Sequence, residues 1–460
     1  MSTLDRLRGI VQGTRPSAVP VVAPELEQST SRSESDGLSH RLPATAEAAA
    51  LRTSHAAGVL GGTVKDRAEG AVIIVDREYR AGDLHGRRRI GDLIDTIHEG
   101  QDALATMACA WPSAKGVGGT LLFLDLETTG LFGGAGTQAF LVGCAAIDGD
   151  SIRVRQFMMP GFEHERAVLH EMAAWAATHG ALVTYNGRTF DVPLIETRFL
   201  FHRVPFPLAE VPHLDMLHAA RRLWRGRPNT AGPDPDESSC SLSVLEKHLA
   251  GVHRVGDVPG FEIPSRYFQF VRDGDARPLE AVLEHNRLDL ISLAAVMARA
   301  LTLVGGGPLE SSNPHECLGL ARLYERAGAS ANAEAALLRS IDLAKRIGSE
   351  PEVHGEALRR LAWLRRRARR VHEAADAWRE LASLPRCAAA LRREAKEALA
   401  IYHEHRSRDL GAARSLVLDV LKDDPLGRRK VEAEHRLQRL DRKLSAATPG
   451  GLLSALEDSV

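Results

Sequence analysis

Four carboxylates stand out from the apolar or uncharged residues around them. Asp125 and Glu127 lie in T-L-L-F-L-D-L-E-T-T-G at 120–130, where an apolar run precedes the first acid. In a strand, residues i and i+2 point the same way, so these two side chains project together. Two carboxylates side by side repel each other, and a cation bound between them relieves the repulsion. The stretch therefore predicts a cation site on a buried strand.

Two further acids follow later in the chain. Asp191 ends N-G-R-T-F-D at 186–191, and Asp289 ends H-N-R-L-D at 285–289. Each acid alone is weak evidence, since a single strand-end aspartate is more often a helix cap or a salt-bridge partner than a ligand. Residues i and i+4 share a helix face, which places His285 beside Asp289 as a base or water-orienting group. The alternative for His285 is a capping or packing role.

The elements that must position these acids alternate between strands and helices. Apolar periodicity predicts strands at 121–126, 140–147, 151–158 and 181–185, and helices at 163–178, 192–202, 242–250 and 278–303. The turn D-G-D at 148–150 predicts a hairpin between the second and third strands. This pattern predicts an α/β fold, a mixed sheet flanked by helices.

The chain divides into five predicted parts. Residues 1–70, rich in Ser, Ala, Pro and Thr, are expected to be a disordered leader. Residues 71–118 are expected to be an N-terminal extension with a strand at 71–75 and a helix at 90–107, and residues 119–303 form the α/β domain. An all-α repeat domain is predicted at 304–445, followed by a tail at 446–460.

The repeat prediction rests on small residues that recur at matching offsets. Three copies begin at Ala321, Ala362 and Ala400, 41 and 38 residues apart. Because a tetratricopeptide unit has about 34 residues, we describe the copies as tetratricopeptide-like. Such a solenoid binds a partner or braces the neighbouring domain.

Composition limits the class of protein. Lys plus Arg number 59 and Asp plus Glu 60, so a polyanionic partner would have to be held by local patches. The five cysteines form no CxxC pair, which argues against a zinc cluster or a disulfide framework and fits a reducing cytoplasm. We find no signal peptide and no apolar run of membrane-spanning length, so we expect a cytoplasmic protein without membrane contact.

Taken together, the four acids resemble the motifs of the DEDD exonucleases in the RNase H-like (DnaQ-like) superfamily. D-x-E-T-T-G matches the first motif, N-x-x-x-F-D the second, and the acid on the late helix the third. The segments 124–137, 184–194, 213–224 and 284–289 are similar to the bacterial YprB-like family, which joins such a nuclease domain to tetratricopeptide repeats. The resemblance implies an RNase H-like fold from about residue 71 to the repeats. DEDD enzymes carry Y-x-x-x-D or H-x-x-x-x-D, whereas His285 and Asp289 combine the histidine with the shorter spacing.

The resemblance implies a metal-dependent 3′-5′ exonuclease that hydrolyses phosphodiester bonds by a two-metal-ion mechanism. Hard Mg²⁺ or Mn²⁺ ions prefer oxygen ligands, and two of them roughly 3.5–4 Å apart activate a water and relieve the leaving oxygen of its charge. By resemblance, Asp125 would bridge both ions, Glu127 and Asp289 would hold the ion that carries the attacking water, and Asp191 would hold the second. Asp215 resembles an accessory acid of the family and is expected to cap a helix or support the site rather than to bind metal.

The resemblance also suggests the partners. DNA is favoured over RNA, in DNA repair, with a helicase or another protein bound by the repeats. The alternative is a scaffold protein that recognises nucleic-acid ends and acts mainly through its repeats, with little or no hydrolysis.

A basic cluster with an aromatic residue is expected to contact the nucleic acid. Arg221, Arg222 and Arg225 surround Trp224, and cations beside an aromatic ring hold single strands. A solvated helix face is the alternative. The arginine-rich run 359–370 in the repeats is expected to be such a solvated face.

Three residues near the acids complete the expected substrate contacts. Tyr185 and Asn186 follow a predicted strand close to Asp191, where they could stack on a base or orient the scissile nucleotide. A core position explains Tyr185 equally well. Thr128 follows Glu127 directly and is the third expected contact.

Overall fold

The computed structural model describes residues 46–130, 136–224, 240–423 and 430–447. Residues 48–460 form one compact unit of the chain and residues 1–47 another.

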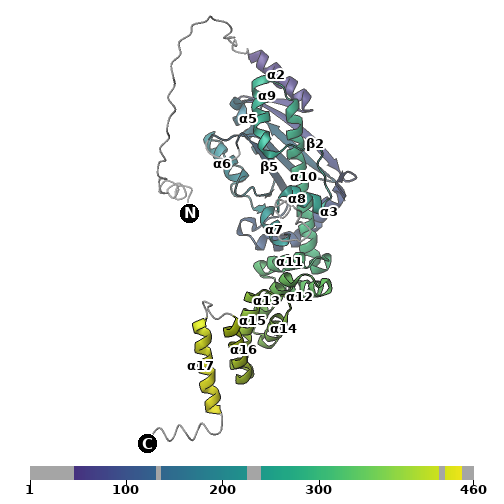
Figure 1. Ribbon diagram of the computed structural model, residues 1–460. Coiled ribbons are helices and arrows are strands. Elements are labelled where there is room, and N and C mark those ends of the chain that lie inside the picture. The colour runs from purple at the N-terminus through teal and green to yellow at the C-terminus, as the bar shows by residue number, and fades with distance from the viewer. Residues whose placement is uncertain (1–45, 131–135, 225–239, 424–429, 448–460) are drawn as a thin grey trace, which may run out of the picture. The chain divides into compact units, whose positions relative to one another are not determined.

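A mixed sheet forms the first half of this unit (Figure 1). It has seven strands, in the order β1-β2-β7-β6-β5-β8-β9. The strands from β1 to β5 in this order pair antiparallel. β8 pairs parallel with β5, and β9 pairs parallel with β8. The strands are β1 Thr63–Arg67, β2 Gly70–Arg80, β5 Leu121–Thr128, β6 Ala139–Asp148, β7 Ser151–Met158, β8 Ala181–Thr184 and β9 His213–Asp215. A separate two-stranded hairpin consists of β3 Leu84–His85 and β4 Arg88–Arg89.

Helices cover both faces of the sheet. Alternate residues of β5 fall into two hydrophobic cores: Phe123 lies in one, while Leu122 and Leu124 lie in the other. The helices of this half are α3 Ile90–Glu99, α4 Gln101–Cys109, α5 Glu165–Ala176, α6 Asp191–Phe201, α7 Met216–Leu223, α8 Leu242–Leu249, α9 Ile263–Asp273 and α10 Arg277–Gly306. The predicted mixed sheet flanked by helices is therefore confirmed. The sequence did not predict α9 or the three-residue β9, and the expected helix at 90–107 is two helices that meet at Gly100.

Helix α10 contacts β5, β6 and β7 (Figure 1). The segment 277–310 is long and apolar enough to cross a membrane, which corrects the expectation that no apolar run approaches that length. Its apolar window is 72% buried within the protein, as in a helix of a protein core.

The predicted disordered leader is wrong for its last part. Helix α2 spans Ala46–Val59, and β1 pairs antiparallel with β2 at the edge of the sheet. The alanine-rich sequence favours the helix, whose Ala56 and Ala57 are buried, and the pairing with β2 orders the polar strand β1. β2 also pairs with β7, so it belongs to the main sheet and not to a separate extension. Residues 1–45 lie outside the described residues.

The second half of the unit is helical, as predicted. Its helices are α11 Pro314–Ala327, α12 Ser330–Ile347, α13 Pro351–Arg367, α14 Val371–Ser383, α15 Ala389–Tyr402, α16 Leu410–Asp423 and α17 Lys430–Ala447 (Figure 1). Each helix packs against the next. The three repeat starts, Ala321, Ala362 and Ala400, are buried in α11, α13 and α15. Each copy begins in one of these helices and continues into the next helix, so it corresponds to one helical hairpin.

Candidate active site

Asp125 and Glu127 lie on β5, between β6 and β8 in the sheet. Burial raises the pKa of the Asp125 carboxyl well above its usual range, and the negative charges of Asp289, Glu127 and Asp191 raise it further. Burial, followed by the charges of Asp289 and Asp191, also raises the pKa of Glu127. Charges that act on one another in this way lie within electrostatic reach, so the four acids that the sequence singled out face the same region of the protein.

Asn286 of α10 orients Asp125. Its Nδ2 donates to Oδ2 of Asp125 at 2.8 Å, and its Oδ1 accepts from Nε2 of Gln156 at 2.8 Å. Asn286 is 0% exposed. It fits there because Gly143, which lies between Asp125 and Gln156 in the register of β5, β6 and β7, has no side chain. A Cβ at Gly143 would lie 2.0 Å from Oδ1 of Asn286.

Asp289 is held by an arginine from another element. Arg254, in the loop after α8, donates to Oδ1 of Asp289, and its guanidinium also binds both carboxylate oxygens of Glu246 at 2.6 and 2.8 Å. Glu246 is buried and accepts a further hydrogen bond from the Ser292 hydroxyl. The carboxylate of Glu246 therefore positions Arg254, which in turn positions Asp289.

His285 lies beside Asp289, as its spacing predicts. Its Nε2 is 3.6 Å from Oδ2 of Asp289, and its Nδ1 is 2.7 Å from Oδ1 of Asp257. Although burial opposes the effect, the hydrogen bond from His285 holds the pKa of Asp257 below its usual value. A charged Asp257 favours the tautomer with the proton on Nδ1, which makes Nε2 the basic nitrogen.

Asp191 begins α6, directly after a loop that Asp215 holds in place. Burial, and then the charge of Asp215, raises the pKa of Asp191 to about 7, with a smaller effect from Asp289. Asp215 accepts from the backbone N–H groups of Asn186 and Arg188 and caps α7 by accepting from Leu217 N–H. This capping role is the one that the sequence predicts for Asp215. Asn186 has a positive φ of 66°, which turns the chain from β8 towards Asp191.

Comparison with known proteins agrees with this geometry. The family model of the RNase H superfamily matches residues 122–301, which contain all four acids. The protein YprB of Bacillus subtilis (strain 168) is 33% identical over 384 residues, covering 81% of this chain and 86% of YprB. The chain belongs to the family of YprB, and its residues 122–301 form a domain of the RNase H superfamily. The match to YprB extends beyond the sheet, so the relationship includes much of the helical half.

In this RNase H-like chain, the donor set fits a hard divalent cation. The four candidate ligands are carboxylates, and Asp125, Glu127 and Asp191 have pKa values raised by burial and neighbouring negative charge. A bound cation would offset that repulsion. As they are placed, no three His, Cys, Asp or Glu side chains of the described residues form a ready cluster for an ion.

Trp224 is not available to stack on a base, so its expected substrate contact is wrong. It is 2% exposed, and its Nε1 donates to Oε1 of Glu316 at 2.7 Å. Glu316 belongs to α11, so Trp224 joins the sheet domain to the helical half. The apolar ring gains more from burial at this joint than from a solvent-facing position.

The other expected substrate contacts lie in different places. Arg221 is exposed on α7, whereas Arg222 is half-buried with its guanidinium 5.8 Å from the centre of the Trp111 ring. Arg225 lies outside the described residues. Tyr185 packs against the core and donates its hydroxyl proton to the carbonyl of Cys240, in line with the core alternative. Thr128 donates to the carbonyl of Gly130 at 2.8 Å, at the end of β5.

Sequence reasoning missed the residues that orient the acids. Asn286 lies on the same helix as Asp289. The asparagine directly after His285 was the sequence signal that could have identified it. Arg254 and Asp257 lie in the loop 251–259, whose residues show no periodicity. Gln156 lies on the predicted strand 151–158, yet only its register against Gly143 reveals its role.

Proposed function

We propose that this protein is a metal-dependent 3′-5′ exonuclease of the DEDD type that acts on nucleic acid by a two-metal-ion mechanism. The observation that carries the proposal is that Asp125, Glu127, Asp191 and Asp289 lie within electrostatic reach of one another, and that burial and negative neighbours raise the pKa of the first three. Buried carboxylates that repel one another are destabilising without bound cations, so their presence in an RNase H superfamily domain supports catalysis.

Each side chain of the site has a proposed task. Asp125, Glu127, Asp191 and Asp289 would hold Mg²⁺ or Mn²⁺, which activates water and offsets charge on the leaving oxygen. Asn286 keeps Asp125 in its orientation, and Arg254 does the same for Asp289. Asp257 holds the Nδ1 proton of His285, so Nε2 accepts the proton of the attacking water.

The helical hairpins are proposed to be tetratricopeptide-like, with a helicase or another protein as their partner. The preference for DNA over RNA and the role in DNA repair rest on the family resemblance. All five cysteines lie in the described part of the chain and none of them forms a disulfide, which supports a cytoplasmic location.

The test is cleavage of end-labelled single strands by purified variants. With Mg²⁺ or Mn²⁺, we expect the wild type to shorten labelled DNA from its 3′ end, and Asp125→Asn and Asp191→Asn to be slower by at least about a hundredfold. Asp150→Asn, in the exposed β6–β7 turn, is the matched control and should cleave normally. Cleavage by both site variants, or undiminished cleavage in chelator, would exclude the proposed mechanism. RNA of the same sequence tests the sugar preference.

The second candidate function is a nucleic-acid-binding scaffold. Asp289 is already paired with Arg254, and this pairing is the observation that favours it. A wild-type protein that binds labelled strands but cleaves neither DNA nor RNA with either ion would establish the scaffold instead.

A further inference from the structure

A cluster of arginines lies where the sheet domain meets the helical half. Arg222 of α7 covers the ring of Trp111, and Arg326 of α11 donates from Nε to the carbonyl of Ala110. Both guanidiniums are therefore held at the same turn, residues 110–111, which follows α4. Helices α7 and α11 pack directly against each other at this place (Figure 1).

Two more arginines extend the cluster into the helical half. Arg360 of α13 binds Glu325 of α11 at 2.7 Å and Glu356 at 2.7 Å. Glu356 is also approached by Arg322 at 3.8 Å and by Arg359 at 3.6 Å. Arg322, Arg359 and Arg360 together face three carboxylates, because Arg359 also binds Glu394 at 2.7 Å. Among the described residues, Arg222 and Arg326 form no ion pair with a carboxylate, so these two guanidiniums leave positive charge in excess.

The lowered pKa values of two arginines agree with an excess of positive charge in the cluster. Burial first, and then the charges of Arg326 and Arg360, lowers the pKa of Arg222. Burial and Arg360 lower the pKa of Arg322, against the opposing effect of Glu356 and Glu325. Guanidiniums that repel one another in this way are relieved by an anion.

The same turn contacts the loop that leads to Asp191. Arg188 donates from Nη1 to the Ser113 hydroxyl at 2.6 Å. Arg188 lies three residues before Asp191, in the loop that Asp215 holds. The turn 110–114 therefore connects a cation of the loop before Asp191 with the cations of α7 and α11.

We propose that Arg188, Arg222, Arg322, Arg326 and Arg360, named the arginine track, bind successive phosphates of a single strand whose end lies at the carboxylates. This inference rests on the proposed nuclease function and makes α11 and α13 part of the nucleic-acid interface. Because Arg222 covers Trp111, which is itself buried, the track offers charge without base stacking. Its contacts are to phosphates and carry no sequence preference.

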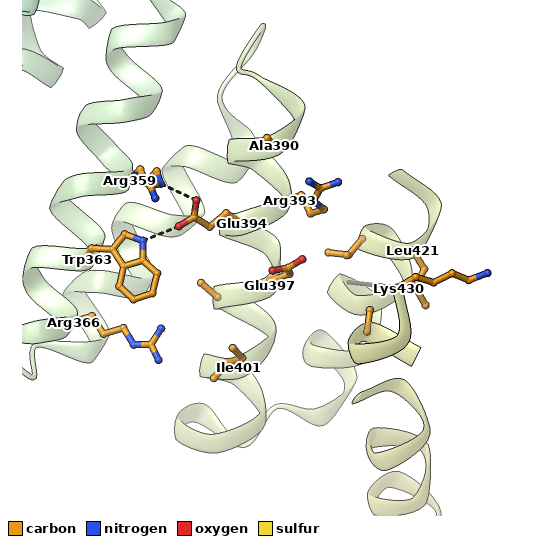
Figure 2. Close-up of a pocket in the computed structure, with 13 residues that line it drawn as sticks. Arg359, Trp363, Arg366, Ala390, Arg393, Glu394, Glu397, Ile401, Leu421 and Lys430 are labelled. Atoms are coloured by element: carbon orange, nitrogen blue, oxygen red, sulfur yellow. Dashed lines mark hydrogen bonds and ion pairs between the residues drawn. The ribbon is translucent and has the colours of Figure 1, made fainter. Parts of the chain in front are cut away.

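A cavity of 790 Å³ between α13, α15, α16 and α17 is a less suitable place for a polyanion (Figure 2). There Glu394 accepts from Nε of Arg359 and from Nε1 of Trp363, both at 2.7 Å (Figure 2). Glu394 and Glu397 offset two of the four cations of its lining, and the lining includes no residue of the turn 110–114 that leads to the loop before Asp191.

The test measures binding of fluorescein-labelled oligothymidylates by anisotropy, in chelator so that no cleavage occurs. For strands of about 4 to about 24 nucleotides, we expect affinity to rise with length until the track is filled. Arg222→Gln/Arg326→Gln should bind the longest strand roughly tenfold more weakly, and its slope of log affinity against log salt should fall by about 1.4. The loss of affinity in this variant should grow with strand length, because the shortest strands do not reach both arginines.

Two further variants separate charge from structure. Arg272→Gln/Arg346→Gln removes the same charge from exposed residues at the ends of α9 and α12, and should bind like the wild type. Arg222→Lys/Arg326→Lys keeps the charge while altering the contacts to Trp111 and Ala110, and should retain most of the salt slope. Thermal unfolding of each variant verifies the fold.

Several other results would overturn the arginine track, and one would refute the nuclease proposal alone. Equal losses in the Lys and Gln variants, an unchanged salt slope, or a wild type that binds no strand would overturn the track. Competition by polyglutamate as effective as by DNA would assign the cluster to an acidic protein and overturn the track as well. Strands that bind through the track but are never cut with Mg²⁺ or Mn²⁺ would refute the nuclease proposal alone.

Discussion

The orientation of Asp125 depends on Asn286, a side chain that binds no substrate. Asn286 is completely buried, and leaving its amide without partners would cost more free energy than its hydrogen bonds contribute. Asn286 must therefore keep its hydrogen bonds to Asp125 and Gln156. Gly143 provides the room for this pairing. A residue with no side chain is therefore as important to the geometry of the site as the acids themselves.

We predict that Gly143→Ala disrupts the site without changing any acid. The new methyl group would lie 2.0 Å from Oδ1 of Asn286, so Asn286 must move and Asp125 loses its donor. We expect the free energy of unfolding to fall by about 1–3 kcal/mol. The rate of strand cleavage should fall roughly tenfold or more, because the acids are no longer pre-oriented.

The matched control for that variant is Gly82→Ala, where an added Cβ meets no atom within 4 Å. Urea unfolding and single-turnover cleavage of both variants provide the comparison. If Gly143→Ala cleaved strands at the wild-type rate, Asn286 would not be the residue that orients Asp125.

At the scale of elements, α10 is held against α8 and the β3–β4 hairpin by a buried polar chain. His85 of β3 donates from Nε2 to Ser292 at 2.8 Å, and Ser292 donates to Glu246, which binds Arg254. Three elements far apart in the sequence thus meet behind Asp289. Burial, followed by the positive charge of Arg254, lowers the pKa of His85 to about 4.

This lowered pKa predicts a loss of stability in mild acid. Below about pH 6.5 the unfolded chain protonates His85 while the folded chain does not, so the unfolded state binds more protons. The contribution to the free energy of unfolding is therefore present above pH 6.5 and falls by up to about 3 kcal/mol as the pH drops to about 4. His85→Gln, whose amide can donate to Ser292, should show a shallower decline.

Urea unfolding at several pH values between 4 and 7 measures this difference. His98→Gln, at an exposed histidine of α3, should follow the wild-type profile. If wild type and His85→Gln declined in parallel, His85 would not be the group that titrates.

At the scale of the molecule, the sheet domain and the helical half share one hydrophobic core. The cluster around Phe123 continues through α10 and α7 to residues of α11, α13 and α15. Gly319 of α11 allows close approach, since a Cβ there would lie 2.2 Å from the carbonyl oxygen of Arg222. Trp224 and Arg299 both bind Glu316 at this joint.

We predict that Trp224→Phe lowers the free energy of unfolding by about 1–3 kcal/mol, because buried Glu316 loses a donor. Trp363→Phe is the matched control: its Nε1 also donates to a glutamate at 2.7 Å, but Trp363 is only half-buried. Trp363→Phe should therefore lower the free energy of unfolding by less than Trp224→Phe does. Calorimetry of both variants measures the effect, and equal costs would show that the joint contributes no special stability.

Much of this protein could be predicted from its sequence because the signals are local. Period-two and period-3.6 patterns mark the strands and helices, since each repeats within a few residues. The i, i+2 spacing placed Asp125 with Glu127, and the i, i+4 spacing placed His285 beside Asp289.

Other features were decided only by tertiary structure. The pairing of Arg254 with Asp289, of Asp257 with His285, and of Asn286 with Gln156 joins residues from different elements. The burial of Trp224 likewise depends on α11, which begins about 90 residues further along the chain. Periodicity describes which face of an element is buried but not which partner covers it, so these contacts follow only from the way the elements pack.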